Sequence, residues 1–291
     1  MMKLGFSSNA FRKFPLSEAI ETISQIGYNG IEIMCDAPHA YPPDVTDAYI
    51  AETRSLLQQK GLTVANLNAF MMTAARMRRG DDGIPEFPRS PDDFWLPSYI
   101  QSEPTGRRTR IEHTINCLRL AKEFGAGGIS IEPGGPLEDF SEEEGLNRFA
   151  AALEEIIPVA EELGVELRIE PEPGLVIERS DQYLKFMERI DSPMVGLNLD
   201  IGHIYCVGED PADAIRRLSD HIRYIQIEDI AATRVHQHLV PGDGAIDFDS
   251  VFEALRDVNY QGWVTVELYP LLDDPHTAAQ RAYDYLKPYF D

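Results

Sequence analysis

The stretch VGLNLDIGH at residues 195–203 indicates both how the chain folds and where its chemistry lies. Leu197 and Leu199 alternate with small or polar residues, which predicts a short, half-buried strand. The strand ends at Asp200, and His203 follows three residues later across a glycine turn. A carboxylate and an imidazole at the end of a strand are suited to metal binding or acid–base chemistry. Taken alone, the same pattern also fits a solvated turn in which Asp200 caps a helix.

Outward from this stretch, strand-like and helix-like segments alternate along the chain. Strands are predicted over residues 3–8, 30–35, 63–69, 128–132, 165–170, 195–200, 222–227 and 262–267. Helices are predicted over residues 16–26, 47–60, 111–124, 141–163, 180–190, 211–218, 248–258 and 275–289. Eight strand–helix units in 291 residues are typical of a single (β/α)₈ TIM barrel, an α/β fold, so we expect one domain over 1–291. A doubly wound open sheet is the alternative, but no glycine-rich phosphate-binding motif follows the first strand.

One segment, residues 70–110, interrupts this alternation. It contains several prolines together with Phe94, Trp95 and Tyr99. Connections of this length are usually functional lids or disordered, and the aromatic residues argue against disorder. We therefore expect a lid insertion over the catalytic face, with Trp95 and Tyr99 excluding water. A purely structural excursion is the alternative.

The composition limits the classes of partner and the compartment. There are 49 Asp and Glu residues against 26 Lys and Arg, and the net charge of −23 argues against nucleic acid and anionic membranes as partners. No apolar run is long enough to span a bilayer, and the N-terminus has no signal-peptide pattern. Cys35, Cys117 and Cys206 lie in apolar surroundings and are expected to be reduced, which favours a cytoplasmic protein.

Four polar side chains end the last four predicted strands: Glu170, Asp200, Gln226 and Glu267. Their residue numbers differ by 30, 26 and 41, about one strand–helix unit each. Because the carboxyl ends of barrel strands meet at one face, we expect the four side chains to converge. Three carboxylates and one amide oxygen form an oxygen-rich cage that suits Mn²⁺ or Mg²⁺, and without a cation the carboxylates would repel one another. Each residue alone also fits an ordinary polar position at a strand end.

These strand ends belong to motifs that resemble those of a known family. The motifs are Ile169-Glu170-Pro171, Leu199-Asp200-Ile-Gly-His203, Ile225-Gln226-Ile-Glu-Asp229, Pro241-Gly242-Asp-Gly244-Ala-Ile246-Asp247 and Val266-Glu267. They are similar to the motifs of the xylose-isomerase-like superfamily of sugar isomerases and epimerases, and the likeness covers nearly the whole chain.

The resemblance implies a metal site and a substrate contact. Glu170, Asp200, Gln226 and Glu267 match the ligands of one divalent ion, with Mn²⁺ favoured and Mg²⁺, Co²⁺ or Zn²⁺ as alternatives. His203 matches a substrate-contacting position of the ketose 3-epimerases. Those enzymes often have His as the third ligand, so the glutamine at position 226 makes the chain more similar to hydroxypyruvate isomerase at this position.

The apurinic endonuclease branch of the same superfamily fits this chain less well. That branch holds three zinc ions and needs a His after the fourth strand, where this chain has Glu132. His236 and His238 do fall where the branch has metal ligands, so the resemblance does not exclude a second metal ion. The acidic net charge also makes a DNA-repair role the weaker interpretation.

Further residues are candidates for contact with the substrate. His236 and His238 alternate before a Pro-Gly turn, so both can face the site, and Glu132 ends the fourth predicted strand. The full set of substrate-binding candidates is His203, His238, Glu132, His236 and Trp95. Glu32, His39 and Glu172 are weaker candidates, for which structural roles are equal alternatives.

The resemblance implies a divalent-metal-dependent isomerase or epimerase of a small keto-sugar or hydroxy-carbonyl compound. Glu170 and Glu267 are the expected catalytic pair, which removes and returns a carbon-bound proton through an enediolate. One alternative is a metal-dependent lyase, such as a dehydratase of a sugar- or cyclitol-like substrate. Another is a non-catalytic protein that binds metal or sugar. The pattern decides neither the exact substrate nor whether the chain forms a homo-oligomer.

Overall fold

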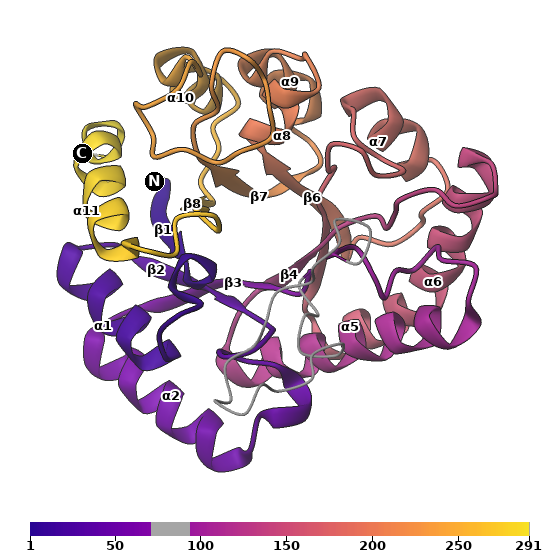
Figure 1. The fold of residues 1–291 in the computed structure, drawn as a ribbon, viewed down its shortest axis with the longest axis horizontal. Helices are drawn as coiled ribbons and strands as arrows, with labels where there is room; N and C mark the ends of the chain where they lie inside the picture. The colour runs from indigo at the N-terminus through magenta and orange to yellow at the C-terminus, as the bar shows by residue number, and fades with distance from the viewer. Residues whose placement is uncertain (71–93, 291) are drawn as a thin grey trace.

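The chain folds into a closed barrel of eight parallel strands, which confirms the predicted (β/α)₈ fold (Figure 1). The computed structural model describes residues 1–70 and 94–290. Each strand pairs with the next along the chain, and β1 pairs with β8 to close the ring. The strands are β1 (Lys3–Ser7), β2 (Gly30–Met34), β3 (Thr63–Asn68), β4 (Gly128–Ile131), β5 (Glu166–Ile169), β6 (Val195–Asp200), β7 (Ile222–Ile227) and β8 (Trp263–Val266).

Helices surround the barrel. They are α1 (Leu16–Ile26), α2 (Asp47–Lys60), α5 (Pro104–Phe124), α6 (Glu142–Leu163), α7 (Ser180–Met187), α8 (Ile201–Cys206), α9 (Pro211–Leu218), α10 (Phe248–Asp257) and α11 (Pro275–Leu286). Short 3₁₀ helices are η1 (Ser8–Phe11), η2 (Pro42–Asp44) and η3 (Lys287–Tyr289). Among the helices of the described residues, none has the length and apolar character to cross a membrane.

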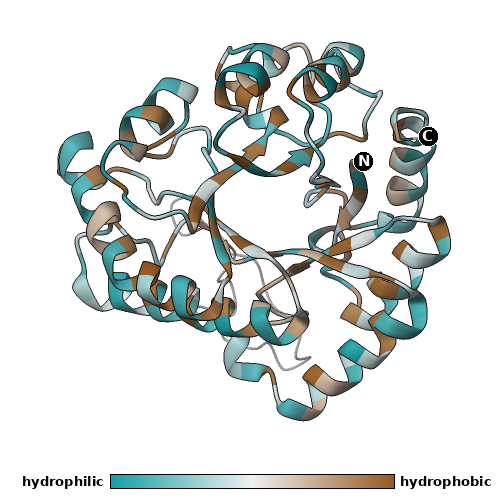
Figure 2. Ribbon diagram, turned by 180° about the vertical axis from the view of Figure 1, so that it is seen from behind, coloured by the Kyte–Doolittle hydropathy of each residue, from teal (hydrophilic) through white to brown (hydrophobic). Residues whose placement is uncertain are grey.

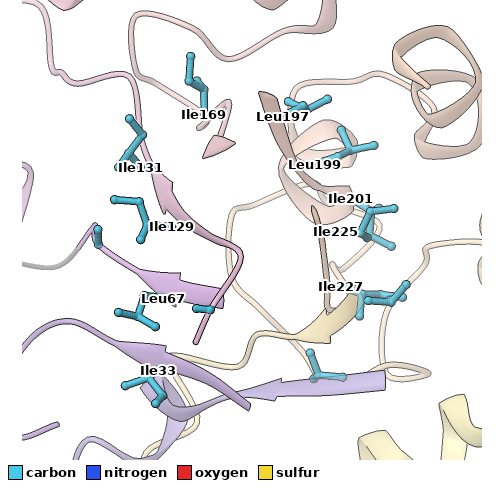
Figure 3. Close-up of a cluster of buried hydrophobic side chains, with 14 of the residues drawn as sticks. Ile33, Leu67, Ile129, Ile131, Ile169, Leu197, Leu199, Ile201, Ile225 and Ile227 are labelled. Atoms are coloured by element: carbon cyan, nitrogen blue, oxygen red, sulfur yellow. The ribbon is translucent and has the colours of Figure 1, made fainter. Parts of the chain in front are cut away.

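The alternating pattern of the strands separates two environments. Apolar residues such as Leu67, Ile129, Leu197 and Ile225 lie on the outer side of the strands, where the helices cover them (Figure 3). Figure 2 shows the complementary arrangement in the helices, whose outer sides carry hydrophilic residues. Burying this apolar layer stabilises the fold by about 25 cal/mol for each Å² removed from water.

The inner side of the strands is polar and hydrogen-bonded rather than apolar. Asn66 donates to Glu32 at 2.8 Å and to Ser130 at 2.9 Å, and Arg168 donates to the Asn66 side-chain oxygen at 3.2 Å. These side chains are buried, so their mutual hydrogen bonds replace those lost to water. The polar interior continues up to the carboxyl face and supports the side chains there.

The predicted insertion at 70–110 is corrected at its C-terminal end. Helix α5 begins at Pro104, not at residue 111, so the final residues of the segment belong to the barrel. Glu103 caps this helix by accepting the backbone N–H groups of Thr105 and Gly106 at 2.8 and 2.6 Å. Proline at the first helical position reinforces this start. Residues 71–93, most of the predicted lid, lie outside the described residues.

Two aromatic residues of the segment occupy different places. Tyr99 is fully buried, and its hydroxyl lies 2.5 Å from the Thr114 hydroxyl on α5; its role in covering the site stays a prediction. Its ring packs against that of Phe149 on α6, with 5.4 Å between the centroids. Trp95 is half-buried and stacks on Phe70, the residue that follows Ala69 beyond β3.

Candidate active site

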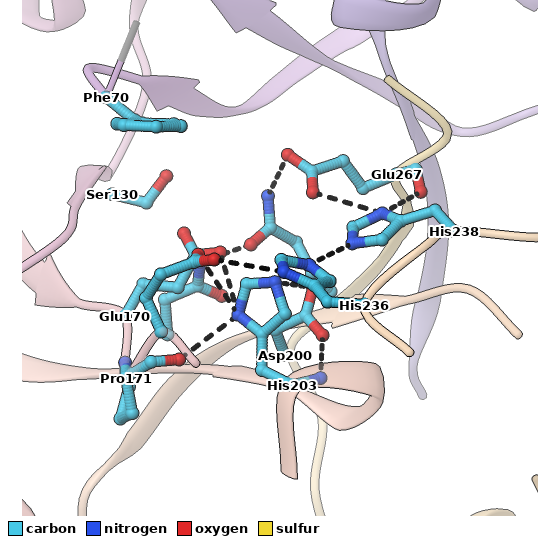
Figure 4. A network of polar contacts seen from close by, with 12 residues as sticks. Phe70, Ser130, Glu170, Pro171, Asp200, His203, His236, His238 and Glu267 are labelled. Atoms are coloured by element: carbon cyan, nitrogen blue, oxygen red, sulfur yellow. Dashed lines mark hydrogen bonds and ion pairs between the residues drawn. The ribbon is translucent and has the colours of Figure 1, made fainter. Parts of the chain in front are cut away.

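The carboxyl ends of β5, β6 and β8 bring together three of the four predicted ligands, Glu170, Asp200 and Glu267 (Figure 4), and the fourth, Gln226 on β7, donates to Glu267. Asp200 and Gln226 face each other in the β6–β7 register. Glu170 and Glu267 follow β5 and β8 directly, and their backbone N–H groups bond to the neighbouring strands at 2.8 and 3.1 Å. Potential ligand atoms of Glu170, Asp200 and Glu267 all lie within 4.8 Å of one another, and the three residues are buried.

The amide of Gln226 lies beside these carboxylates at the polar interior of the barrel. Its nitrogen donates to Glu267 Oε1 and to Glu32 Oε1, both at 3.1 Å. Its oxygen accepts a hydrogen bond from Asn198. A role as an oxygen ligand therefore requires the amide to turn about its last side-chain bond, which exchanges the positions of its oxygen and nitrogen.

The electrostatics of the three carboxylates fit a divalent cation. Burial raises the pKa of Glu170 well above its ordinary value, and the nearby charges of Glu267 and Asp200 raise it further. The pKa of Glu267 is raised in the same way, by burial and then by Glu32 and Asp200. Asp200 Oδ2 is buried without a hydrogen-bonding partner. A hard cation would satisfy this oxygen and offset the repulsion, so the donor set fits Mn²⁺ or Mg²⁺.

Asp200 also shapes the local backbone. Its Oδ1 accepts the backbone N–H of His203 at 2.9 Å, which caps the N-terminus of α8. The helix-capping alternative is therefore correct for one oxygen of Asp200, while the other oxygen remains available for a ligand. Capping fixes the carboxylate and points His203 toward the same face of the barrel (Figure 4).

Three histidines form a cluster next to the carboxylates. The rings of His203 and His236 meet at 4.6 Å between centroids, and the Nε2 atoms of His236 and His238 are 3.1 Å apart. Burial lowers the pKa of His203 to about 4 and those of His236 and His238 to about 3, so all three are neutral at pH 7. His238 Nδ1 lies 2.9 Å from the backbone oxygen of Glu267 and donates to it, which leaves the lone pair on Nε2.

Glu172 lies on the far side of this cluster. Its Oε2 is 3.4 Å from His203 Nδ1, and its Oε1 is 3.4 Å from His236 Nδ1. Burial raises its pKa well above the ordinary value for a glutamate. Glu172 thus joins the two imidazoles, although prolines flank it in the sequence.

Glu132, a predicted substrate contact, is engaged in an ion pair. It follows β4 and pairs with Arg110 from α5, and both side chains are buried. Burial raises the pKa of Glu132 to about 7, against the opposing effect of Arg110. The other oxygen of Glu132, Oε2, is buried without a hydrogen-bonding partner. The nearby Arg110 also donates to the Phe70 carbonyl and thereby ties the exit of β3 to α5.

The two weaker candidates on the N-terminal side differ in their surroundings. Glu32 is fully buried inside the barrel, where its carboxylate contacts the Gln226 amide, and burial raises its pKa. His39 instead contacts Ser8 Oγ at 3.0 Å and two backbone oxygens at 3.2 Å. These contacts give His39 a structural role in joining the loops after β1 and β2.

Several polar residues at the site were missed from the sequence. Asn198 donates to Glu170 Oε2 at 2.8 Å, and Asn9 on η1 donates to Glu267 Oε1 at 2.8 Å. Glu228 is fully buried next to Asp200. Strand periodicity could have indicated Asn198 and Glu228, because each lies two residues from a predicted ligand on the same strand or its extension. No local signal identifies Asn9, which reaches the site only through barrel closure.

Asp229 holds the loop that carries His236 and His238. Its Oδ1 accepts the backbone N–H groups of residues 230 and 246 at 2.9 and 3.1 Å, and its Oδ2 accepts those of residues 242 and 244 at 2.9 and 2.8 Å. Four charge-assisted hydrogen bonds to one carboxylate fix both ends of this loop. Asp229 therefore supports the fold, in contrast to Asp200, which has an oxygen left over.

The chain belongs to the xylose isomerase-like TIM barrel family, whose model matches residues 20–289. It is 26% identical over 288 residues to a fructoselysine 3-epimerase of Escherichia coli O157:H7, covering 97% of this chain and 96% of the relative. It is 30% identical over 224 residues to an inosose dehydratase of Bacillus thuringiensis (strain Al Hakam), covering 66% of this chain and 74% of the relative. The solved structure of the IOLI protein with a bound zinc atom superimposes with a TM-score of 0.78 at 20% identity, and the match covers all of both chains. The predicted resemblance is thereby confirmed at the level of the family.

Proposed function

We propose that this chain is a divalent-metal-dependent isomerase or epimerase of a small keto-sugar or hydroxy-carbonyl compound. The single observation that carries the proposal is the convergence of three buried carboxylates, Glu170, Asp200 and Glu267, at the carboxyl face of the barrel. Active sites of this fold lie at that face. The names of the relatives, an epimerase and a dehydratase, support an enzyme that acts on a sugar-like compound.

Glu170, Asp200, Gln226 and Glu267 would hold the metal ion. Three carboxylates and an amide oxygen favour Mn²⁺, with Mg²⁺, Co²⁺ or Zn²⁺ as alternatives. The zinc atom bound by the IOLI protein, which shares this fold, supports a divalent ion in this chain. When bound, the ion supplies Lewis acidity to the carbonyl and adjacent hydroxyl oxygens of the substrate.

Glu170 and Glu267 are the proposed proton carriers. Asn9 and the Gln226 amide hold Glu267 Oε1 at 2.8 and 3.1 Å, while its Oε2 makes no such bond to them. Asn198 holds Glu170 Oε2 at 2.8 Å in a similar way. Each carboxylate thus has one oxygen fixed by amides and one oxygen directed to the site. One carboxylate would remove a proton from the carbon next to the carbonyl, and the other would return it.

The substrate would bind beside the histidine cluster. His203 and His238 are neutral at pH 7 and can exchange hydrogen bonds with hydroxyl groups. His236, Glu132 and Trp95 are the further proposed contacts. Glu132 would contribute its unpartnered oxygen, because Arg110 occupies the other.

A metal-dependent dehydratase is the second candidate function, and the inosose dehydratase relative favours it. The same residues would remove the carbon-bound proton, but the electron pair would then expel a neighbouring hydroxyl group as water. The product of a dehydratase is therefore lighter than its substrate by one water, whereas an isomerase leaves the mass unchanged.

Hydrogen exchange with solvent tests the proposal. Protein loaded with Mn²⁺ is incubated in deuterated water with free ketohexoses, a fructosamine and a keto-inositol, and each compound is analysed by NMR and mass spectrometry. We expect deuterium to enter one carbon position of at least one compound, and to be lost after chelation. The Glu267→Gln variant is the control for background exchange. Absence of metal-dependent exchange and of water loss across the panel would contradict both candidate functions.

A further inference from the structure

Glu172 is a buried carboxylate at the site that the mechanism above does not use. It lies just beyond the end of β5, and it has an exposed fraction of 5%. Its Oε1 is buried without a hydrogen-bonding partner. Among residues 1–70 and 94–290, no Lys or Arg forms a salt bridge with Glu172, and its charged-group contacts are two imidazoles. Because a buried carboxylate oxygen without a partner costs free energy, a ligand that satisfies this oxygen would bind favourably.

The hydrogen bonds of the histidine cluster decide which of its nitrogen atoms carry a proton. His238 donates its Nδ1 proton to the Glu267 backbone oxygen at 2.9 Å, so its Nε2 has a lone pair. His236 Nε2 lies 3.1 Å from His238 Nε2 and therefore donates to that lone pair (Figure 4). Because the His236 imidazole is neutral at pH 7, its other nitrogen, Nδ1, then has no proton.

The unprotonated Nδ1 of His236 lies next to the unpartnered oxygen of Glu172. The two atoms, His236 Nδ1 and Glu172 Oε1, are 3.4 Å apart, and no hydrogen bond joins them. Both atoms are acceptors, so the pair lacks a donor. The His236 side chain is 24% exposed, so a ligand can reach this pair of acceptors from the solvent.

A protonated amino group satisfies both acceptors. A primary or secondary ammonium has at least two N–H donors, whereas a sugar hydroxyl has only one O–H donor. The ammonium also supplies the positive charge that the Glu172 carboxylate lacks, and hydrogen bonds between charged groups are stronger than those between neutral groups. A phosphorylated sugar would instead be repelled by the neighbouring carboxylates of Glu170 and Glu172.

We propose that Glu172 Oε1 and His236 Nδ1 bind a protonated amino group of the substrate, which makes the substrate an aminated keto-sugar. The inference rests on the proposed function, because it requires a sugar to bind at this face of the barrel. Potential ligand atoms of Glu170, Glu172 and His203 lie within 4.8 Å of one another. The amino group would therefore lie close to the carbon from which Glu170 removes a proton. An amine on the carbon next to the carbonyl fits this separation.

Two sugars that differ in one group test the inference. In 1-amino-1-deoxy-D-fructose a protonated amine replaces a hydroxyl group of D-fructose. Isothermal titration calorimetry at pH 7 measures the Kd of each sugar for the Mn²⁺-loaded protein. We expect the amino sugar to bind about 10–100-fold more tightly than fructose, because charged groups form the stronger hydrogen bonds.

Variants test whether this preference depends on Glu172. Glu172→Gln keeps the shape of the side chain but removes its charge, so the preference for the amino sugar should disappear. Glu178→Gln is the matched control on the same loop between β5 and α7, where the partly exposed carboxylate accepts the Gly174 N–H at 2.9 Å. This control should keep the preference. His236→Ala should lose only part of it, because the imidazole supplies an acceptor but no charge.

Other results overturn the inference without deciding the proposed function. Equal binding of the two sugars by the parent protein, no binding of either, or a preference that Glu172→Gln retains would refute the amino-group site. Metal-dependent deuterium exchange or water loss with another compound of the panel would then still support an enzyme at this face. Conversely, tighter binding of the amino sugar without exchange or water loss in any compound would support the site and contradict the proposed function.

A neutral derivative gives an answer that needs no variant. In 1-acetamido-1-deoxy-D-fructose the nitrogen has no positive charge and only one N–H donor. We expect the parent protein to bind this derivative no more tightly than fructose. Binding as tight as that of the amino sugar would refute the site, and this comparison holds even if Glu172→Gln does not fold.

Discussion

Replacing Asp200 with asparagine separates metal binding from folding. The amide keeps an oxygen that can accept the His203 N–H and cap α8, so the helix start is preserved. The change removes one negative charge from the group that contains Glu170 and Glu267. That charge contributes to the raised pKa values of both glutamates, so we expect their pKa values to fall. A carboxylate whose pKa is raised in the folded state makes the folded protein less stable once the pH exceeds that pKa. At pH 8 the melting temperature of the metal-free variant should therefore equal or exceed that of the metal-free parent.

The metal should stabilise the parent far more than this variant. At a metal concentration of 100 times its Kd, the parent gains about 2.7 kcal/mol. Loss of one buried charged ligand costs about 2–5 kcal/mol, so a Kd weakened about 100-fold is a conservative expectation. At the same metal concentration the variant then gains about 0.4 kcal/mol. The difference of about 2.3 kcal/mol corresponds to about 4 °C in Tm for a chain of this size.

Differential scanning calorimetry with and without Mn²⁺ provides the assay, and Asp229→Asn is the matched control. That change replaces one oxygen that accepts two backbone N–H groups, so it should destabilise the metal-free protein by about 3–6 kcal/mol. Asp229→Asn should leave the stabilisation by the bound metal ion unchanged. If Asp200→Asn keeps the parent's metal-induced shift, Asp200 is not a ligand. If it instead destabilises the metal-free protein as Asp229→Asn does, its role is structural.

Three further predictions follow from the site and its surroundings. Glu170→Gln and Glu267→Gln should each slow hydrogen exchange between substrate and deuterated solvent by about 10²–10⁴-fold, as NMR would measure, and a near-parent rate for either would refute the two-carboxylate mechanism. Arg110→Met leaves Glu132 buried and unpaired, so the free energy of unfolding measured in urea should fall by about 3–5 kcal/mol. Adding Glu132→Leu should recover most of this loss. An unchanged free energy of unfolding in Arg110→Met would contradict a structural role of the ion pair. The pKa of His236 is about 3 in the folded protein against an ordinary 6.5, so the protein should lose stability as the pH falls below 6.5. His236→Gln should make the melting temperature depend less steeply on pH in this range. An unchanged pH dependence would contradict the lowered pKa of His236.

The sequence predicted the barrel and its principal site because both depend on local patterns. Period-two alternation in strands such as β6 places apolar side chains outside and polar ones inside, and strand ends in this fold meet at one face. The convergence of Glu170, Asp200 and Glu267 follows from these two facts. The start of α5 was predicted at residue 111 instead of Pro104, although a proline at the first helical position was a signal for the earlier start.

The remaining features depend on tertiary contacts that no local pattern encodes. Asn9 and Glu267 are separated by 258 residues and meet only because β1 closes against β8. The burial of Tyr99 reflects the position of α5, not the aromatic character of the segment. The orientation of the Gln226 amide likewise depends on its neighbours Glu32 and Asn198.

Anomalous diffraction at the manganese absorption edge, from crystals of the Mn²⁺-loaded protein, locates the bound ion among the side chains at the carboxyl face. We expect an anomalous peak enclosed by Glu170, Asp200, Gln226 and Glu267, with the Gln226 side-chain oxygen turned toward the ion. A fully loaded crystal with no peak among these four side chains, or with manganese bound only by the histidines, would contradict it.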